Sequence, residues 1–413
     1  RFGAAYRLTE STVFRAGFGI SYTPFPDNNY AYNYPVRANN VYNGLSTYVP
    51  AVLNTGQSAT FQNGFPAAQL PAIPASGILP APINQAYFTV SKNFKNPYVQ
   101  SWNFAIQQAL PKKFTLDMAY VGNHGVDSVV QYNANAGLIP GAGSAGQPQF
   151  ATFGRTAATT VLFAPFSNSY NSLQVKLDRR FAAALNITTS YTFGKGMAFQ
   201  DADDGGLTFY VNQRRNYARN NFDRTQTFVQ SYIYELPFGP GKKWLNSGVM
   251  GNILGNWRLT GILTLMSGLP FTVTADGTAL NLPGSTQTAN QLYPVAILGG
   301  IGPGNPWFTP VSFGQPTGSG VAGNSGRNIL SGPMFVNLDA SLAKVVTFRE
   351  RYSFEIRGEA FGVTNTAQFA NPNSNVSNQS TFGQVTSTLG AGSGALGGGG
   401  GARTLQLGAK FSF

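Results

Sequence analysis

The strongest constraint on the fold is the strict alternation of apolar and polar residues over 402–413. A period of two places alternate side chains on opposite faces of an extended strand. The segment has the length, about 9–11 residues, that a tilted strand needs to cross a bilayer. We therefore expect one face to meet lipid and the other to meet water. The apolar set is Leu405, Leu407, Ala409, Phe411 and Phe413, and the polar set is Thr404, Gln406, Gly408, Lys410 and Ser412.

The same alternation recurs along the whole chain, and no segment shows a sustained helical period. In residues 12–22, for example, Phe14, Phe18 and Ile20 alternate with Val13, Arg15 and glycines. The pattern predicts about eleven strands, at 1–8, 12–22, 98–110, 113–120, 172–178, 185–193, 222–236, 257–265, 336–342, 352–360 and 402–413.

The connections between these strands differ in length on the two sides. One side has the tight connections near 9–11, 111–112, 182–183 and 347–350, with 237–255 as a longer exception. The other side has the long connections near 23–97, 124–169, 196–221, 268–334 and 365–401. Short periplasmic turns and long outer loops are typical of outer-membrane barrels. The sequence thus predicts an all-β protein, an antiparallel transmembrane β-barrel.

Composition agrees with a barrel and excludes several other classes. Charged residues make up 10% of the chain, against about 25% in ordinary globular proteins. No run of apolar residues is long enough for a transmembrane helix. The net charge is +12, but the basic residues are scattered, so we expect outer-membrane lipid and lipopolysaccharide as partners and no nucleic acid. A soluble β-sandwich also alternates, but its strands are commonly shorter and its connections do not sort by side.

Five stretches carry a resemblance to a known family. In order, they resemble the C-terminal barrel of TonB-dependent outer-membrane receptors of the Oar-like kind, which often carry an N-terminal carboxypeptidase-regulatory-like domain. Residues 23–95 add little to this resemblance. The stretches are NPYVQSWNFAIQQALP with FTLDMAYVGNHG; FDRTQTFVQSYIYELPFGPGKKW; NWRLTGILTLMSGLPFTV; FEIRGEAFGVTNTAQFANPN; and STFGQVTSTLG with GARTLQLGAKFSF.

The resemblance implies a bacterial outer-membrane location and a twenty-two-stranded barrel closed by a plug. On this interpretation residues 1–413 are the C-terminal part, about half of the barrel, with the plug, TonB box and signal peptide absent. The expected function is TonB-dependent uptake of an unidentified solute; an outer-membrane adhesin or structural surface protein, or a passive pore, is the alternative. The end of the chain also resembles the C-terminal recognition strand of outer-membrane barrels, in which the assembly machinery recognises a glycine followed by alternate aromatics, here Gly408, Phe411 and Phe413.

Polar residues of the strands are expected to line the lumen as a charge-compensated wall or a polar ligand path. Residues four apart on a strand, such as Glu355 and Glu359, are about 13 Å apart, too far for a glycosidase carboxylate pair. The expected lumen-facing residues are Arg15, Lys113, Asp117, Lys176, Asp178, Arg258, Asp339, Glu355, Arg357, Glu359 and Lys410.

We expect no enzymatic activity, resident metal or cofactor. Asp201, Asp203 and Asp204 are weak metal candidates, since calcium prefers several oxygen ligands. Their spacing lacks the later glutamate of an EF-hand loop, and Asp/Gly runs are commonly turns. His124 is the one histidine and cysteine is absent, which excludes zinc sites built from several histidines or thiolates.

Overall fold

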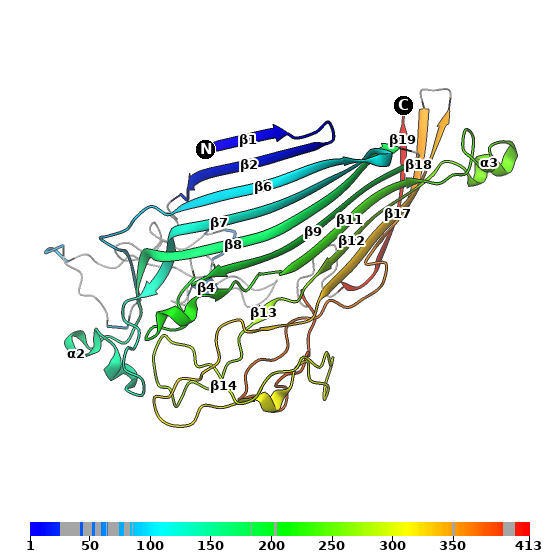
Figure 1. Cartoon of the computed structure of the whole chain (residues 1–413). Helices are drawn as coiled ribbons and strands as arrows, with labels where there is room; N and C mark the ends of the chain where they lie inside the picture. Colours follow the sequence, from blue (N-terminus) through cyan, green and yellow to red (C-terminus); the bar gives the residue numbers. More distant parts are fainter. Residues whose placement is uncertain are drawn as a thin grey trace.

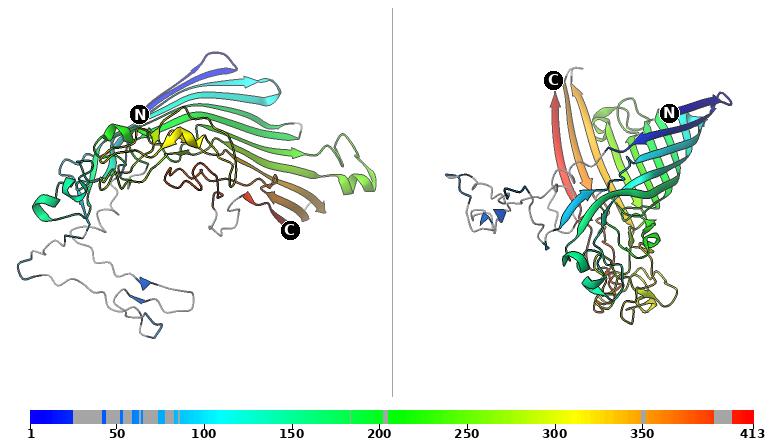
Figure 2. Two further views of the ribbon diagram at one scale, coloured as in Figure 1. Left: turned by 90° about the horizontal axis from the view of Figure 1, so that it is seen from below. Right: turned by 90° about the vertical axis from the view of Figure 1, so that its left-hand side faces the viewer.

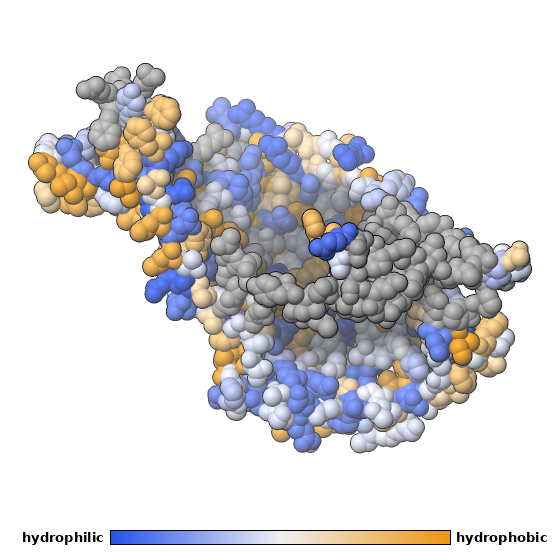
Figure 3. Space-filling view, turned by 180° about the vertical axis from the view of Figure 1, so that it is seen from behind, coloured by the Kyte–Doolittle hydropathy of each residue, from blue (hydrophilic) through white to orange (hydrophobic). Residues whose placement is uncertain are grey.

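The computed structural model describes residues 1–24, 42–43, 52–53, 59–62, 64, 74–77, 83–84, 86–182, 184–201, 205–348, 352–390 and 401–413. Within these ranges, thirteen strands form one sheet, and most neighbours are antiparallel. Figures 1 and 2 show that the sheet is curved across its width, with β1 at one margin and β19 at the other. From behind, the molecule is hollowed, with hydrophilic and hydrophobic residues intermixed around the hollow (Figure 3).

The main path of the sheet follows the chain, and each strand on it pairs antiparallel with the next. Off this path, β10 (Ala218–Arg219) pairs with β9, and β5 (Tyr87–Val90) pairs parallel with β8. The path consists of β1 (Phe2–Arg7), β2 (Thr12–Tyr22), β6 (Tyr98–Leu110), β7 (Phe114–Asn133), β8 (Thr159–Ala182), β9 (Leu185–Ala198), β11 (Gln226–Glu235), β12 (Trp257–Met266), β17 (Phe335–Phe348), β18 (Tyr352–Phe361) and β19 (Thr404–Ser412).

One face of the sheet is apolar and remains exposed. Phe104, Tyr120, Leu173 and Phe193 are register partners across β6, β7, β8 and β9. Each of the four residues is between 45% and 51% exposed. Such a row of large apolar side chains would be buried if the sheet packed against a second layer. Instead the row faces outward, as a wall in contact with lipid requires.

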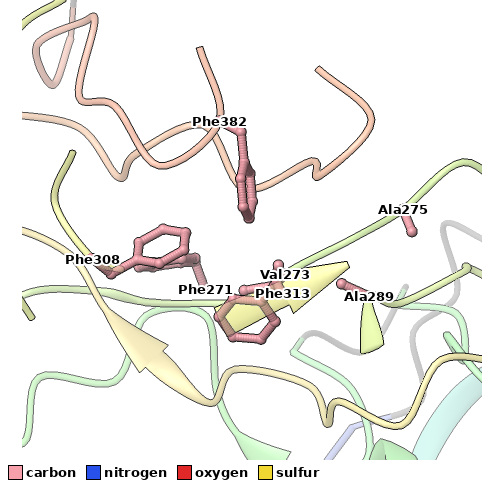
Figure 4. Packing of buried hydrophobic residues seen from close by; sticks show 7 residues of the cluster. All are labelled: Phe271, Val273, Ala275, Ala289, Phe308, Phe313 and Phe382. Atoms are coloured by element: carbon pink, nitrogen blue, oxygen red, sulfur yellow. The ribbon is translucent and has the colours of Figure 1, made fainter. Parts of the chain in front are cut away.

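The largest tightly packed apolar core lies in the long connections, and two smaller cores include residues of β7 and β8 where these strands extend to the loop end. Phe308 is fully buried and makes edge-to-face contacts with Phe313 and Phe382, at centroid distances of 5.8 and 5.3 Å. Figure 4 shows these rings converging from separate segments. Edge-to-face pairs add about 0.5–1.5 kcal/mol beyond area burial. The long connections therefore fold into a structure with a core of its own, which also includes Phe271, Val273, Ala275 and Ala289.

The two ends of the sheet differ as the connection lengths predict. At the turn end, β1–β2, β6–β7, β8–β9 and β17–β18 are joined by tight connections, and the β11–β12 connection holds α3 (Gly248–Leu254). At the loop end, the long connections carry the short elements. These are β3 (Tyr42–Asn43), β4 (Val52–Leu53), η2 (Gly143–Gly146), α2 (Phe150–Phe153), η3 (Gln213–Asn216), β13 (Pro270–Phe271), β14 (Asn290–Gln291), η4 (Pro310–Ser312), β15 (Phe313–Gly314) and β16 (Leu330–Ser331). No helix among the described residues has the length and apolar character needed to span a bilayer.

Several strand boundaries differ from the sequence expectation. The connection expected near 124–169 is shorter, because β7 continues to Asn133 and β8 begins at Thr159. The register shifts between Gly125 and Val130, and Asp127 has a φ of 55°. A bulge adds an unpaired residue and reverses the parity of the residues after it, so the alternation was lost in the sequence although the strands continue. The strand expected from 222 begins at Gln226.

Candidate functional site

A cluster of opposite charges crosses the polar face of the sheet at β12, β17 and β18. Arg258 Nη2 lies 3.8 Å from Glu355 Oε2, and Arg357 Nη1 lies 3.9 Å from Glu355 Oε1. Arg357 Nε lies 3.6 Å from Glu359 Oε1. We call Arg258, Glu355, Arg357 and Glu359 the charge cluster. Its charges balance, so this part of the face is polar without a net charge.

Small residues make room for these long side chains. Register pairing forms one row from Arg258 through Ala343 and Arg357 to Gly408. Ala343 is 4% exposed, and its methyl group leaves the space above β17 open to Arg258 and Glu355. A Cβ on Gly408 would lie 3.1 Å from Arg357 Nε, so the arginine lies against a strand without a side chain. Gly408, expected as part of an assembly signal, thus also accommodates Arg357.

Other expected lumen residues fall on the same face by register. Lys410 is the register partner of Glu355 on β19. Asp339 on β17 is two residues from Ser341, which pairs with Glu359. The Asp339 carboxylate accepts a hydrogen bond of 2.8 Å from the Gly362 backbone N–H, so it fixes the backbone directly after β18.

A second polar group lies on β2, β6, β7 and β8. Arg15 donates to Gln107 Oε1 at 3.3 Å, and Gln107 pairs in register with Asp117. Asp117 in turn pairs with Lys176.

Lys176 and Asp178, two residues apart on the same face of β8, form an ion pair at 2.5 Å.

Lys113 differs from the expected arrangement. It lies in the 3-10 turn η1 (Pro111–Lys113) with a φ of 63°, outside β7. Pro111 begins this turn after β6 ends, so Phe114 is the first residue to rejoin the sheet.

At the loop end the polar face leads into a cavity of about 670 Å³. Its floor is formed by inward-facing residues of β7, β8 and β9, such as Asn123, Tyr170 and Thr192. The β9–β11 connection supplies Asn220, Phe222, Asp223 and Arg224 to its wall. Aromatic rings and hydrogen-bonding groups therefore line one concave site.

Some polar side chains of the cavity already form hydrogen bonds within the protein. Buried Asp223 accepts from the Gly196 N–H at 2.8 Å and from the Thr225 hydroxyl at 3.0 Å. Asn220 differs: its side-chain oxygen is buried and has no hydrogen-bond partner among the described residues. An unsatisfied buried acceptor costs free energy. A donor from a bound molecule or water would remove this cost.

Buried arginines hold the connections around the cavity together. Arg327, 6% exposed at its side chain, pairs with Asp201 Oδ2 at 2.8 Å and donates to the Asn216 and Ala198 carbonyls at 3.0 and 2.6 Å. Burial lowers the pKa of the Arg327 guanidinium, and the Asp201 carboxylate opposes this shift. A planar group with five donors suits such a multiply bonded buried site. Arg327 thus ties the β12–β17 connection to the end of β9.

Arg215 and Arg219 extend the same link. Arg215 Nη2 donates to the Gly323 and Ser325 carbonyls, each at 2.7 Å, and its guanidinium lies 4.3 Å from the Phe209 ring centroid. Burial lowers the pKa of Arg215 as well. Arg219 donates to Ser331 Oγ at 3.0 Å. The β9–β11 and β12–β17 connections are therefore fastened to each other by cations.

Of the three acidic residues considered as metal ligands, the structure describes only Asp201. Asp201 is engaged by Arg327 and also accepts from the Asn221 N–H at 2.6 Å. Asp203 and Asp204 lie outside the described residues. Across the described ranges, no three His, Cys, Asp or Glu side chains are grouped to hold a metal ion.

Sequence reasoning did not find the arginine links or the cavity. The partners of Arg327 and Arg215 lie more than a hundred residues away in the sequence. The Arg214-Arg215 doublet was a visible signal, but a doublet alone does not distinguish a buried link from a solvated surface.

An all-β sheet with an exposed apolar face, a polar opposite face and long connections at one end defines an outer-membrane β-barrel protein. The family model described as an outer membrane beta barrel domain matches residues 1–406, so the chain belongs to this family. The protein is located in the bacterial outer membrane. No curated protein matches the chain.

A solved outer-membrane transporter shares the fold. The outer membrane transporter YddB from Escherichia coli is similar with a TM-score of 0.52 at 8% identity, over 100% of this chain and 40% of YddB. The pyoverdine receptor FpvA from Pseudomonas aeruginosa has a TM-score of 0.45 at 8% identity, over 100% of this chain and 35% of FpvA. BauA from Acinetobacter baumannii, a ferric preacinetobactin receptor, has a TM-score of 0.44 at 8% identity, over 100% of this chain and 36% of BauA. The chain thus spans well under half the length of each.

Proposed function

We propose that the chain is part of an outer-membrane receptor of the Oar-like kind that takes up a solute in a TonB-dependent manner. The observation that carries this proposal is one mainly polar face, on which Ile233 and Ile262 are exposed apolar exceptions. It begins at the cavity lined by Tyr170 and Asn220 and continues to the charge cluster near the turn end. A solute that leaves the cavity inward would meet hydrogen-bonding and balanced charged groups along this face, rather than lipid.

The proposal includes a larger barrel, of which this sheet is the C-terminal part. In the described structure, β1 and β19 each have one neighbour on the sheet path. Unpaired backbone N–H and C=O groups at such margins cannot be exposed to lipid. Further strands therefore pair with β1 and β19 in the membrane. The resemblance to the receptor family implies a plug that would close the lumen and a TonB box that would couple transport to energy from the inner membrane.

Uptake measurements in cells test the proposal. Four strains would carry or lack the intact receptor and carry or lack TonB. The probe is a defined mixture of ferric chelates, oligosaccharides and peptides, whose depletion from the medium is followed by mass spectrometry. We expect at least one solute to be depleted only when receptor and TonB are both present. Depletion that persists without TonB would indicate a passive pore. Surface binding without depletion would favour an adhesin.

Matched variants locate the route. Thr192 lines the cavity, whereas Thr189 on the same strand lies on the opposite, apolar face. Thr192→Trp should fill part of the cavity and reduce uptake, while Thr189→Trp should leave uptake unchanged. Equal uptake by both variants would place the route elsewhere.

A further inference from the structure

The β11–β12 connection exposes an unusual amount of apolar surface. It is the one long connection at the turn end, and it contains the seven-residue helix α3. Val249 is 72% exposed, and Met250 and Ile253 are similarly open to the outside. Figure 3 shows this segment as a projection with hydrophobic residues on its surface, at the upper left, opposite the position of α3 in Figure 1. The exposed apolar residues are Trp244, Leu245, Val249, Met250, Ile253 and Leu254.

The end of α3 is fixed to the apolar face of the sheet. Lys344 pairs in register with Trp257 and Ile356, so it belongs to the apolar row at the turn end. Its ammonium donates to the carbonyls of Asn252, Ile253 and Gly255 at 2.6, 2.7 and 3.1 Å. A cation at these carbonyls satisfies the unpaired acceptors at the end of a helix. The helix is thus held on the lipid side of the wall, not over the polar face.

Glycines make the close backbone contacts inside the β11–β12 connection, and the large side chains therefore point away from the protein. Gly251 is buried, and a Cβ there would lie 2.4 Å from the Leu245 carbonyl oxygen. Gly239 and Gly255 also approach so closely that a Cβ on either would lie 2.5 Å from the other's Cα. The apolar residues of α3 therefore extend outward from this fold and adjoin a surface that meets lipid.

The charges of the segment suit a phospholipid surface. Residues 237–256 contain Lys242 and Lys243 and no acidic residue. Lys242 forms an ion pair with Glu235, which lies on the polar face beside Arg258, so Lys243 is the lysine of this segment that is placed to meet phosphates. The Lys243 ammonium lies 5.1 Å from the Trp244 ring centroid, and tryptophan is enriched at membrane–water interfaces. Lysines near anionic headgroups contribute attraction that salt screens.

We propose that the β11–β12 connection is an interfacial anchor. Val249, Met250 and Ile253 insert at the headgroup–acyl boundary of the periplasmic leaflet, and Lys243 lies among phospholipid phosphates. The end is periplasmic because the short connections lie there. Short amphipathic helices bind membranes in this way through their apolar face. The anchor depends on the outer-membrane location and is independent of solute uptake.

Fluorescence quenching of the intact protein tests the anchor. The chain contains no cysteine, so once any cysteine of the intact protein outside residues 1–413 is replaced, Val249→Cys and Ile253→Cys can each carry a single bimane label. The protein is reconstituted in vesicles of phosphatidylethanolamine and phosphatidylglycerol. Lipids brominated near the headgroup quench from the membrane, and iodide quenches from water. Leu173→Cys serves as the lipid-facing control and Val311→Cys, exposed in a long connection, as the water-facing control.

We expect labels at 249 and 253 to behave as the label at 173 does, with strong quenching by brominated lipid and protection from iodide. Quenching by iodide to the level of the label at 311 would overturn the proposal. Protection from both quenchers would also overturn it, because the helix would then be covered by protein. Two label positions keep the test decisive if one variant fails to fold.

Discussion

Arg258 on β12 and Glu355 on β18 approach to 3.8 Å although β17 lies between the strands that carry them. They can do so because Ala343, the β17 residue opposite Arg258, is small. Long side chains on a sheet commonly interact diagonally with their neighbours. Here an alanine extends that reach across a whole strand, so the Arg258–Glu355 pair of the charge cluster depends on the small volume of one methyl group.

Enlarging Ala343 should therefore disturb the charge cluster. Ala343→Leu places three further carbons under the arginine, and overpacking of this kind costs about 1–3 kcal/mol. Ala340→Leu is the control, since Ala340 lies on the apolar face of the same strand. Urea unfolding of the intact protein in vesicles would report the difference. Equal midpoints for both variants would contradict this role of Ala343.

Removing the Arg327 guanidinium should loosen the long connections and leave the sheet intact. Arg327→Met removes the cation that pairs with Asp201 Oδ2 and donates to two backbone carbonyls. Breaking a buried pair costs about 3–5 kcal/mol. We expect faster proteolysis within 199–225 and 267–334, measured on whole cells. Exposed Arg403→Met is the control, and cleavage no faster than in that variant would refute the arginine link.

Lys344 should position the interfacial helix. Lys344→Met removes the cation from three carbonyls of the β11–β12 connection. We expect a bimane label at 253 to lose part of its protection from iodide, because the end of α3 is released. Lys410→Met, on the polar face, should leave the quenching unchanged. A label that stays equally protected in Lys344→Met would show that lipid alone holds the helix.

Phe411 should matter for assembly more than for the finished fold. Its ring stacks between Tyr352 and Phe413 at centroid distances of 6.0 and 6.2 Å, and all three are on the exposed face. Phe411→Ala should lower the yield of heat-modifiable folded protein in the outer membrane. Leu405→Ala, on the same face of β19, is the control. A loss of yield that is equal in both variants would argue against a specific signal.

The sheet could be predicted because the alternation that defines each strand involves only residues adjacent in the sequence. Ser172 and Leu173 differ in polarity, and a period of two suffices to place them on opposite faces. The prediction was wrong where a bulge at Gly125 to Val130 reversed the parity. It also placed Lys113 on a strand, whereas Pro111 begins a turn that includes it.

The structure of the long connections could not be predicted from the sequence. Arg327 and Asp201 are separated by 126 positions, and the residues around each do not indicate that the two will pair. Asp201 therefore suggested a weak metal ligand, while the structure places it against an arginine. Phe308 and Phe382 likewise meet only after two separate connections have folded.

A membrane wall that passes between the two faces of the sheet explains both their polarity and their exposure. Nitroxide labels at successive positions 172–177 of β8, in the intact protein in vesicles, probe this wall directly. We predict that collisions with oxygen, which concentrates in lipid, peak at Leu173, Val175 and Leu177. Collisions with a water-soluble nickel chelate should peak at Gln174 and Lys176, whereas Ser172, although it lies on the polar face, is buried. Equal access of the nickel chelate to all six positions would contradict a membrane wall at this sheet.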